Sequence, residues 1–168
     1  MATLAELNSW PAAQAREELL RCCGCVKWAD AVAARRPFAD KKALLAASDS
    51  AWAATSEKEW REAFAHHPRI GGKDALRAKF SATSGWAQGE QAGAAAASEA
   101  VLDALSKGNA DYETKFGHIF IVCATGKSAA EMLDLLQSRL ANDPAKEIRI
   151  AAGEQAKITN IRLEKLIP

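Results

Sequence analysis

Hydrophobic residues recur along most of the chain at spacings of three or four, the period of an α-helix. Gly, Pro, Ser and Asp separate the periodic segments, as helix-ending and helix-starting residues do. The pattern predicts helices in segments 9–24, 25–37, 40–48, 56–67, 73–80, 110–117, 128–140 and 145–166, and the longest helix in 81–109, stopping near Gly108.

Residues that cap helix N-termini support several of these boundaries. Ser9 and Asp40 precede two of the segments. The pairs Ser56 with Glu59 and Ser128 with Glu131 match the S-x-x-E capping box, in which each side chain satisfies a backbone N–H of the other residue.

The last segment and one apolar run have patterns of their own. Ile150, Ile158, Ile161 and Leu166 form the predicted core-facing stripe of the C-terminal helix, with Gly153 as a weak point. Residues 118–124, "HIFIVCA", resemble a β-strand, but a single strand cannot form a sheet. We therefore expect a buried extended segment within a helical protein.

Length and composition are those of one globular domain. The 168 residues include 49% hydrophobic and 26% charged residues, and the net charge is +1. The prediction is an all-α, single-domain helical bundle covering residues 1–168. The sequence contains no apolar run long enough to span a membrane and no clustered basic face, so we expect a cytoplasmic protein with no nucleic-acid or membrane partner.

Two apparent motifs give little support for other chemistry. The cluster Cys22, Cys23 and Cys25 lacks the second ligand pair that a zinc site requires, so buried reduced thiols are favoured over a metal or redox role. Gly126 to Ser128 resembles the end of a phosphate-binding loop, but Ile121 occupies the position of its first glycine.

The two adjacent histidines stand at a predicted helix end. Pro68 disfavours helical backbone for His67, so the helix should end there with the ring held by a restricted backbone. The helix dipole would favour the imidazolium and keep its pKa near or above neutrality. His67 is thus a candidate acid or base, although the spacing alone favours simple capping of the helix C-terminus. His66 should be exposed and His118 structural.

Three other polar residues have a structural interpretation that does not require a function. Glu90 and Gln91 stand at the predicted start of a helix, where acidic residues usually complement the dipole. Arg162 lies between Ile161 and Leu163 on the last helix, and most such arginines are solvated or pair locally.

Four fragments in order resemble one family. "HPRIGG", "EQAG", "NADYETKFGHIFIVCATGKSAAEML" and "KITNIRL" are similar to segments of the 2-oxo-4-hydroxy-4-carboxy-5-ureidoimidazoline (OHCU) decarboxylases of urate breakdown. The resemblance extends from about Trp10 to Leu166. It implies an all-α, often dimeric enzyme that uses neither a metal nor an organic cofactor and converts a small purine-derived substrate to (S)-allantoin and CO2.

The resemblance also assigns roles to particular residues. It implies that His67, Glu90 and Arg162 are catalytic. In this interpretation His67 is a general acid or base, and the planar guanidinium of Arg162 binds a carboxylate or oxyanion. The residues that it implies bind substrate are Pro68, Ala87, Gln88, Gly89, Gln91, Phe120, Ile121, Val122, Cys123 and Ala124.

One departure from the family pattern leaves an alternative. Ala87 replaces the serine that begins the family's S-x-x-E-Q motif. A hydrogen bond from that hydroxyl to substrate must therefore be absent or replaced, for example by Ser84. The runner-up hypothesis is a helical ligand-binding module that has lost catalysis, and a thiol-dependent protein using "CCGC" is a third.

Overall fold

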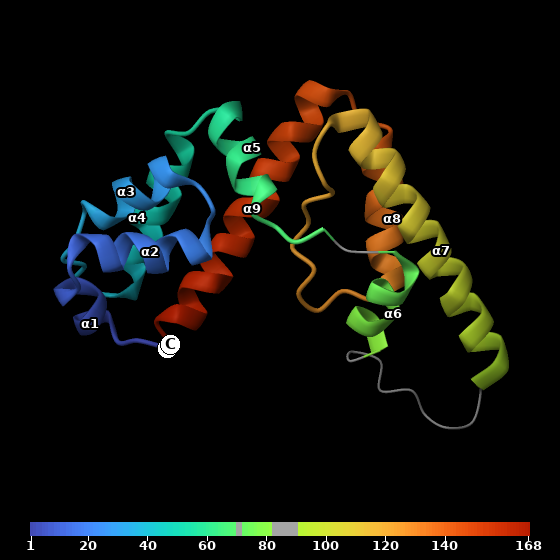
Figure 1. Cartoon of the computed structure of the whole chain (residues 1–168), viewed down its shortest axis with the longest axis horizontal. Coiled ribbons are helices and arrows are strands. Elements are labelled where there is room, and N and C mark those ends of the chain that lie inside the picture. The colour runs from blue at the N-terminus through green and yellow to red at the C-terminus, as the bar shows by residue number, and fades with distance from the viewer. Residues whose placement is uncertain (70–71, 82–90) are drawn as a thin grey trace. The chain divides into compact units, whose positions relative to one another are not determined.

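The computed structural model describes residues 1–69, 72–81 and 91–168 (Figure 1). Within these residues every regular element is a helix, as the all-α prediction requires. The helices are α1 (Leu4–Ser9), α2 (Ala12–Cys22), α3 (Val26–Ala33), α4 (Lys41–Ala53), α5 (Glu57–Ala65), α6 (Lys73–Ser81), α7 (Gln91–Phe116), α8 (Ala129–Leu140) and α9 (Pro144–Leu166).

Local capping determines where several helices start. Both predicted capping boxes are present, at the N-termini of α5 and α8, and Asp40 accepts a hydrogen bond of 2.7 Å from the Ala43 N–H at the start of α4. The prediction for Ser9 is wrong. A short helix that the hydrophobic pattern did not indicate, α1, starts with its own capping box at Thr3 and ends at Ser9, so α2 begins after Pro11.

The chain divides into two compact units. The first comprises Met1–His67, Ile121–Cys123 and Arg149–Pro168, and the second comprises Pro68–Phe120 and Ala124–Ile148. The expected single domain over 1–168 remains a prediction.

Aromatic side chains with satisfied polar atoms form much of the first core. In this unit α3 packs against both α2 and α4 (Figure 1). The fully buried Trp28 donates its indole N–H to the Ser48 carbonyl at 3.1 Å, and Trp52 donates to the Ala152 carbonyl at 3.0 Å. These bonds let large aromatic rings be buried without leaving a donor unpaired.

In the second unit, α7 is longer than predicted. It continues through Gly108 to Phe116, and the predicted separate helix over 110–117 is its C-terminal part. A Cβ on Gly108 would lie 2.6 Å from Leu136 Cδ2, so this glycine permits close packing of α7 on α8 rather than ending a helix. The residue that follows the helix, Gly117, has the left-handed φ of 71° typical of a C-terminal glycine.

The buried face of α9 differs from the predicted stripe. Ile150, Ile158, Ile161 and Leu166 are only partly buried. The buried residues of α9 are Glu147, Ile148, Ala151, Ala152, Gln155, Thr159 and Leu163. The apolar pattern misplaced this face because three of these seven buried residues are polar.

Residues 118–124 form no regular secondary structure, and their burial is uneven. Ile121 is 2% exposed, whereas Phe120 and Val122 are half-buried.

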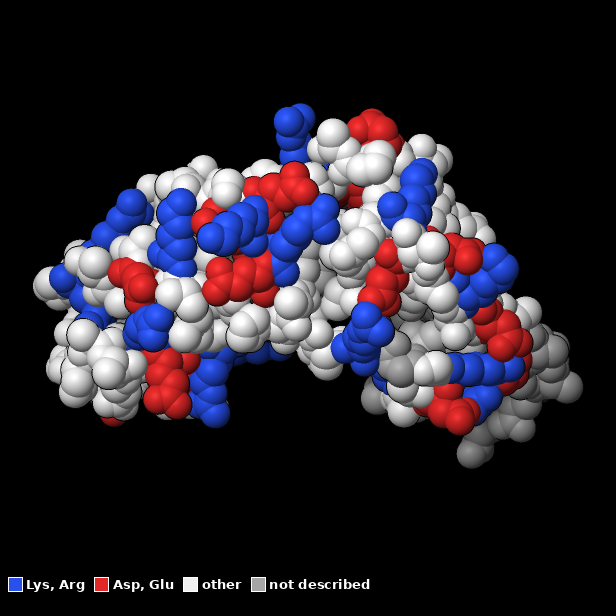
Figure 2. All heavy atoms as spheres, turned by 45° about the horizontal axis from the view of Figure 1, so that its top comes forward, with Lys and Arg blue, Asp and Glu red and all other residues white. Residues whose placement is uncertain are grey.

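On the face shown in Figure 2, Lys and Arg side chains are interspersed with Asp and Glu, in line with the net charge of +1. In the described part of the chain no helix is both long and apolar enough to cross a membrane.

Candidate functional site

His67 lies just beyond the end of α5. The helix ends at Ala65, two residues earlier than predicted, and the His67 N–H donates to the Phe64 carbonyl at 3.1 Å in a final tight turn. His66 is exposed, as expected, whereas the His67 ring is half-buried. The His66 ring packs closely on Gly24, because a Cβ added to Gly24 would lie only 2.1 Å from Cγ of that ring.

The His67 ring contacts the polar part of the buried face of α9. Its Nε2 lies 2.6 Å from Oε1 of Gln155, a side chain with no exposed surface. Gln155 Nε2 in turn donates to Thr159 Oγ1 at 3.1 Å and lies 4.0 Å from Cys23 Sγ. Sequence patterns missed Gln155 and Thr159; polar residues four apart within an otherwise apolar stripe were the available signal.

Burial lowers the pKa of His67 below its usual value of 6.5. The bond to Gln155 opposes this shift, and the positive charge of Arg162 and the neighbouring His66 add to it. The helix dipole was expected to hold the pKa near or above neutrality, but the shift is in the opposite direction. The helix has already ended at Ala65, and desolvation of the ring outweighs any effect of the dipole.

The same unit positions Arg162 close enough to His67 for its charge to act on the imidazole. Arg162 follows Gln155 by seven residues, two turns along the same side of α9. Its Nη1 donates to the Cys22 carbonyl at 3.2 Å, which anchors the half-buried guanidinium. The structure thus brings together two of the three predicted catalytic residues.

Two cysteines of "CCGC" contact this polar centre, Cys23 through its thiol and Cys22 through its backbone carbonyl. Cys22, Cys23 and Cys25 are buried and free. Desolvation raises the pKa of Cys22 to about 11 and that of Cys23 to about 12. Thiols in this state are poor nucleophiles, which argues against the thiol-dependent alternative.

Among the described residues no cluster of three or more His, Cys, Asp or Glu could hold a metal ion.

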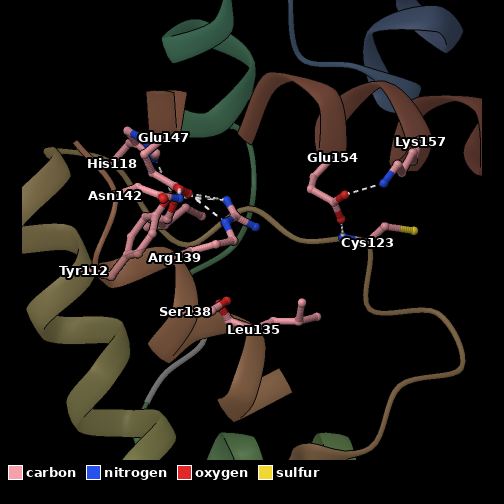
Figure 3. A network of polar contacts seen from close by, with 11 residues as sticks. Tyr112, His118, Cys123, Leu135, Ser138, Arg139, Asn142, Glu147, Glu154 and Lys157 are labelled. Carbon is pink, nitrogen blue, oxygen red and sulfur yellow. Dashed lines mark hydrogen bonds and ion pairs between the residues drawn. The ribbon is translucent and has the colours of Figure 1, made fainter. Parts of the chain in front are cut away.

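Residues 121–123 are fixed to α9 through a carboxylate. The Cys123 N–H donates to Glu154 Oε2 at 2.7 Å, and Lys157 Nζ lies 2.5 Å from the other oxygen of Glu154 (Figure 3). The Glu154 side chain is 15% exposed. Three of the predicted substrate-binding residues, Ile121, Val122 and Cys123, therefore belong to a backbone segment with a fixed position on the helix that carries Gln155.

The second unit contains a buried polar cluster of its own (Figure 3). Glu147, with no exposed surface, accepts hydrogen bonds from Arg139 Nε at 2.7 Å, Asn142 Nδ2 at 2.9 Å and the Tyr112 hydroxyl. The Arg139 guanidinium also lies 4.6 Å from the centre of the Phe120 ring. This cluster anchors Phe120, a predicted substrate-binding residue.

The remaining predicted site residues divide into two groups. Pro68 is exposed and Ala124 is half-buried, and both belong to the second unit. The structure does not describe Ala87, Gln88, Gly89 or Glu90. Gln91 is the first residue of α7, but its side chain is not among the parts that the structure describes.

The fold and the pair of His67 with Arg162 define a small helical protein with an acid–base group beside a cation. A model of the family described as OHCU decarboxylase matches residues 8–164, and the chain belongs to that family. The sequence-based family prediction is therefore confirmed.

Individual relatives agree with the family match. The Arabidopsis thaliana uric acid degradation bifunctional protein TTL is 38% identical over 148 residues, which are 86% of this chain and 45% of that protein. The 2-oxo-4-hydroxy-4-carboxy-5-ureidoimidazoline decarboxylase of Amia calva is 36% identical over 106 residues, 60% of this chain and 57% of that protein. The chain thus spans about half the length of these two relatives.

A solved structure shares the fold. The crystal structure of an OHCU decarboxylase in the presence of (S)-allantoin superposes with a TM-score of 0.71 at 33% identity. The match covers 89% of this chain and 96% of that one.

Proposed function

We propose that the protein converts 2-oxo-4-hydroxy-4-carboxy-5-ureidoimidazoline to (S)-allantoin and CO2 in urate degradation. The observation that carries the proposal is the half-buried His67, bonded to Gln155 and within the electrostatic reach of Arg162, in a chain that belongs to the OHCU decarboxylase family. The names of its relatives, which refer to uric acid degradation and OHCU decarboxylation, support the same reaction.

The reaction needs one proton to be moved and one negative charge to be stabilised. The bond between ring carbon 4 and its carboxylate breaks, CO2 leaves, and the electron pair passes into the conjugated ring. Carbon 5 gains a proton, and the hydroxyl on carbon 4 loses one as it becomes a carbonyl. The conjugated ring itself accepts the electrons, so the protein has to supply proton transfer and charge stabilisation.

His67 and Arg162 are suited to these two tasks. The lowered pKa of His67 leaves its imidazole neutral at pH 7, so the ring can take the hydroxyl proton and return it to carbon. Delivery from one face of the substrate would set the handedness of the product. Arg162 offers a planar fork for the carboxylate or the developing oxyanion.

We carry the other family residues over as parts of the same site. Glu90 would orient the ureido group or the imidazole, and Gln91 can both donate and accept hydrogen bonds. Pro68, residues 87–89 and the backbone of residues 120–124 would contact the substrate. We also propose that the protein is a homodimer, as in the family, which light scattering of the purified chain tests directly.

The replacement of the family serine by Ala87 supports a second candidate function, a ligand-binding module without catalysis. The test is to add the purified protein to freshly generated substrate and follow chiral allantoin by circular dichroism, alongside calorimetric titration with allantoin. Faster formation of (S)-allantoin than in buffer supports the enzyme. Binding without acceleration supports the module and contradicts the decarboxylase.

A further inference from the structure

The core-facing side of α9 contains a polar pair where a helix of this kind usually has aliphatic residues. Gln155 is fully buried and Thr159 is 3% exposed. Burying an amide and a hydroxyl is costly unless each polar atom has a partner. The hydrogen bonds of this pair therefore restrict how the Gln155 amide can be turned.

The Thr159 hydroxyl determines the orientation of the amide. Its Oγ1 lies 2.9 Å from the Gln155 backbone carbonyl, the usual acceptor for a threonine one helical turn further on. A hydroxyl has a single proton, so with that proton donated to the carbonyl, Oγ1 can only accept from the Gln155 side chain 3.1 Å away. The atom facing Thr159 must therefore be Nε2 of Gln155.

This orientation determines which nitrogen of His67 bears the proton. Oε1 of Gln155 then faces His67 Nε2 at 2.6 Å, and a carbonyl oxygen can only accept. Hence His67 Nε2 is the N–H donor. Because only one ring nitrogen of a neutral imidazole is protonated, Nδ1 has the free lone pair.

We propose that Gln155, oriented by Thr159, is a positioning residue that holds neutral His67 with its proton on Nε2, making Nδ1 the atom that exchanges a proton with the substrate. This inference rests on the proposed function and deepens it, because it names the atom of His67 that reacts. Gln155, which bonds the ring, is uncharged, and so are the two side chains beside its amide, Thr159 and the protonated Cys23 thiol. An uncharged acceptor fixes the tautomer but raises the pKa of the ring less than a carboxylate would.

The tautomer can be measured without substrate. We would label the histidines with 15N and record long-range 1H–15N correlations above pH 7, assigning the rings with His66→Asn and His118→Asn variants. The expected spectrum of His67 shows a protonated Nε2, whose proton exchanges slowly with water, and an unprotonated Nδ1. A proton on Nδ1, or an Nε2 proton that exchanges as fast as that of the exposed His66, overturns the proposal.

Variants separate positioning from support of the fold. Gln155→Met, which removes the acceptor, should abolish the slow exchange and lower kcat by about 10- to 100-fold, in line with the loss of other orienting partners, with little change in KM. Gln155→Glu should keep Nε2 protonated and raise the pKa of the ring. Thr159→Val should weaken the protection of the Nε2 proton, and Thr159→Ser, which restores the hydroxyl, should recover it.

The matched control is Gln14→Met on the exposed face of α2, which should match the unmodified protein in spectrum and rate. If Gln155→Met does not fold, the spectrum of the unmodified protein and the two Thr159 variants still decide the matter. Unchanged exchange and kcat in Thr159→Val and Gln155→Met contradict the positioning role. An Nε2–H tautomer in a protein without decarboxylase activity would refute the proposed function alone.

Discussion

Glu147 gives the most quantitative stability prediction, through the substitution Glu147→Gln. The carboxylate has no exposed surface and is bonded to Arg139, Asn142 and Tyr112 (Figure 3). An amide of the same shape has one acceptor oxygen instead of two and carries no charge. Arg139, whose side chain is 8% exposed, would then remain buried without the opposite charge beside it.

The expected loss is large because the substitution breaks a buried ion pair from one side. Breaking one side of a buried ion pair costs about 3 to 5 kcal/mol in the free energy of unfolding. For a protein of this size each kcal/mol corresponds to roughly 2 to 4 °C in Tm, so Glu147→Gln should lower Tm by on the order of 10 °C.

Urea unfolding followed by far-ultraviolet circular dichroism measures the loss, with differential scanning calorimetry for Tm. The control is Glu57→Gln, at the exposed i,i+4 pair with Arg61, where the expected cost is only about 0.3 to 0.5 kcal/mol. The double variant Arg139→Met with Glu147→Met removes both charges and should lose less than Glu147→Gln. A loss below about 1 kcal/mol in Glu147→Gln would refute the reasoning, since the carboxylate would then not be needed to compensate Arg139.

Three further predictions concern the site around His67. The pKa of His67 in the folded protein is lowered from its ordinary value of 6.5, so between the folded-state pKa and 6.5 the unfolded chain binds more protons than the folded one. The free energy of unfolding should therefore fall as pH drops through that window. The value of kcat/KM should rise with pH through an apparent pKa below 6.5, and a midpoint above 6.5 would contradict neutral His67 as the base. Gly24→Ala should displace the His66 ring and lower the free energy of unfolding, measured in urea, by about 1 to 3 kcal/mol. The control Gly153→Ala, with nothing within 4 Å of the new Cβ, should raise that free energy by up to about 1 kcal/mol. Equal effects of the two substitutions would show that the space around Gly24 is not restricted. Arg162→Lys retains the charge but not the planar fork, so steady-state assays should show a fall in kcat of about 10-fold or more, and full activity would remove the guanidinium geometry from the mechanism.

Local signals in the sequence predicted what depends on local structure. The capping boxes at Ser56 and Ser128 and the cap at Asp40 form as expected, because each involves residues only three apart. The end of α7 was wrong because Gly108 is needed for contact with Leu136, a requirement of tertiary packing that local propensity does not reveal.

The site was only partly predictable, for a related reason. His67 was a candidate from its place at a helix end before Pro68, the role of Arg162 came only from resemblance to the family, and the structure brings the two residues into the same unit. Gln155 and Thr159 were missed because apolar periodicity assigns polar residues to the solvent face. The direction of the His67 pKa shift was missed too, because desolvation depends on neighbours remote in sequence.

The central claim is that His67 transfers the proton that decarboxylation requires. The most direct measurement is the initial rate of (S)-allantoin formation, followed by circular dichroism on freshly generated substrate, for the unmodified protein and for His67→Asn. The account predicts that the variant keeps the helical spectrum and cooperative unfolding of the unmodified protein but forms (S)-allantoin no faster than buffer. A folded His67→Asn variant that turns over substrate at the unmodified rate would contradict it.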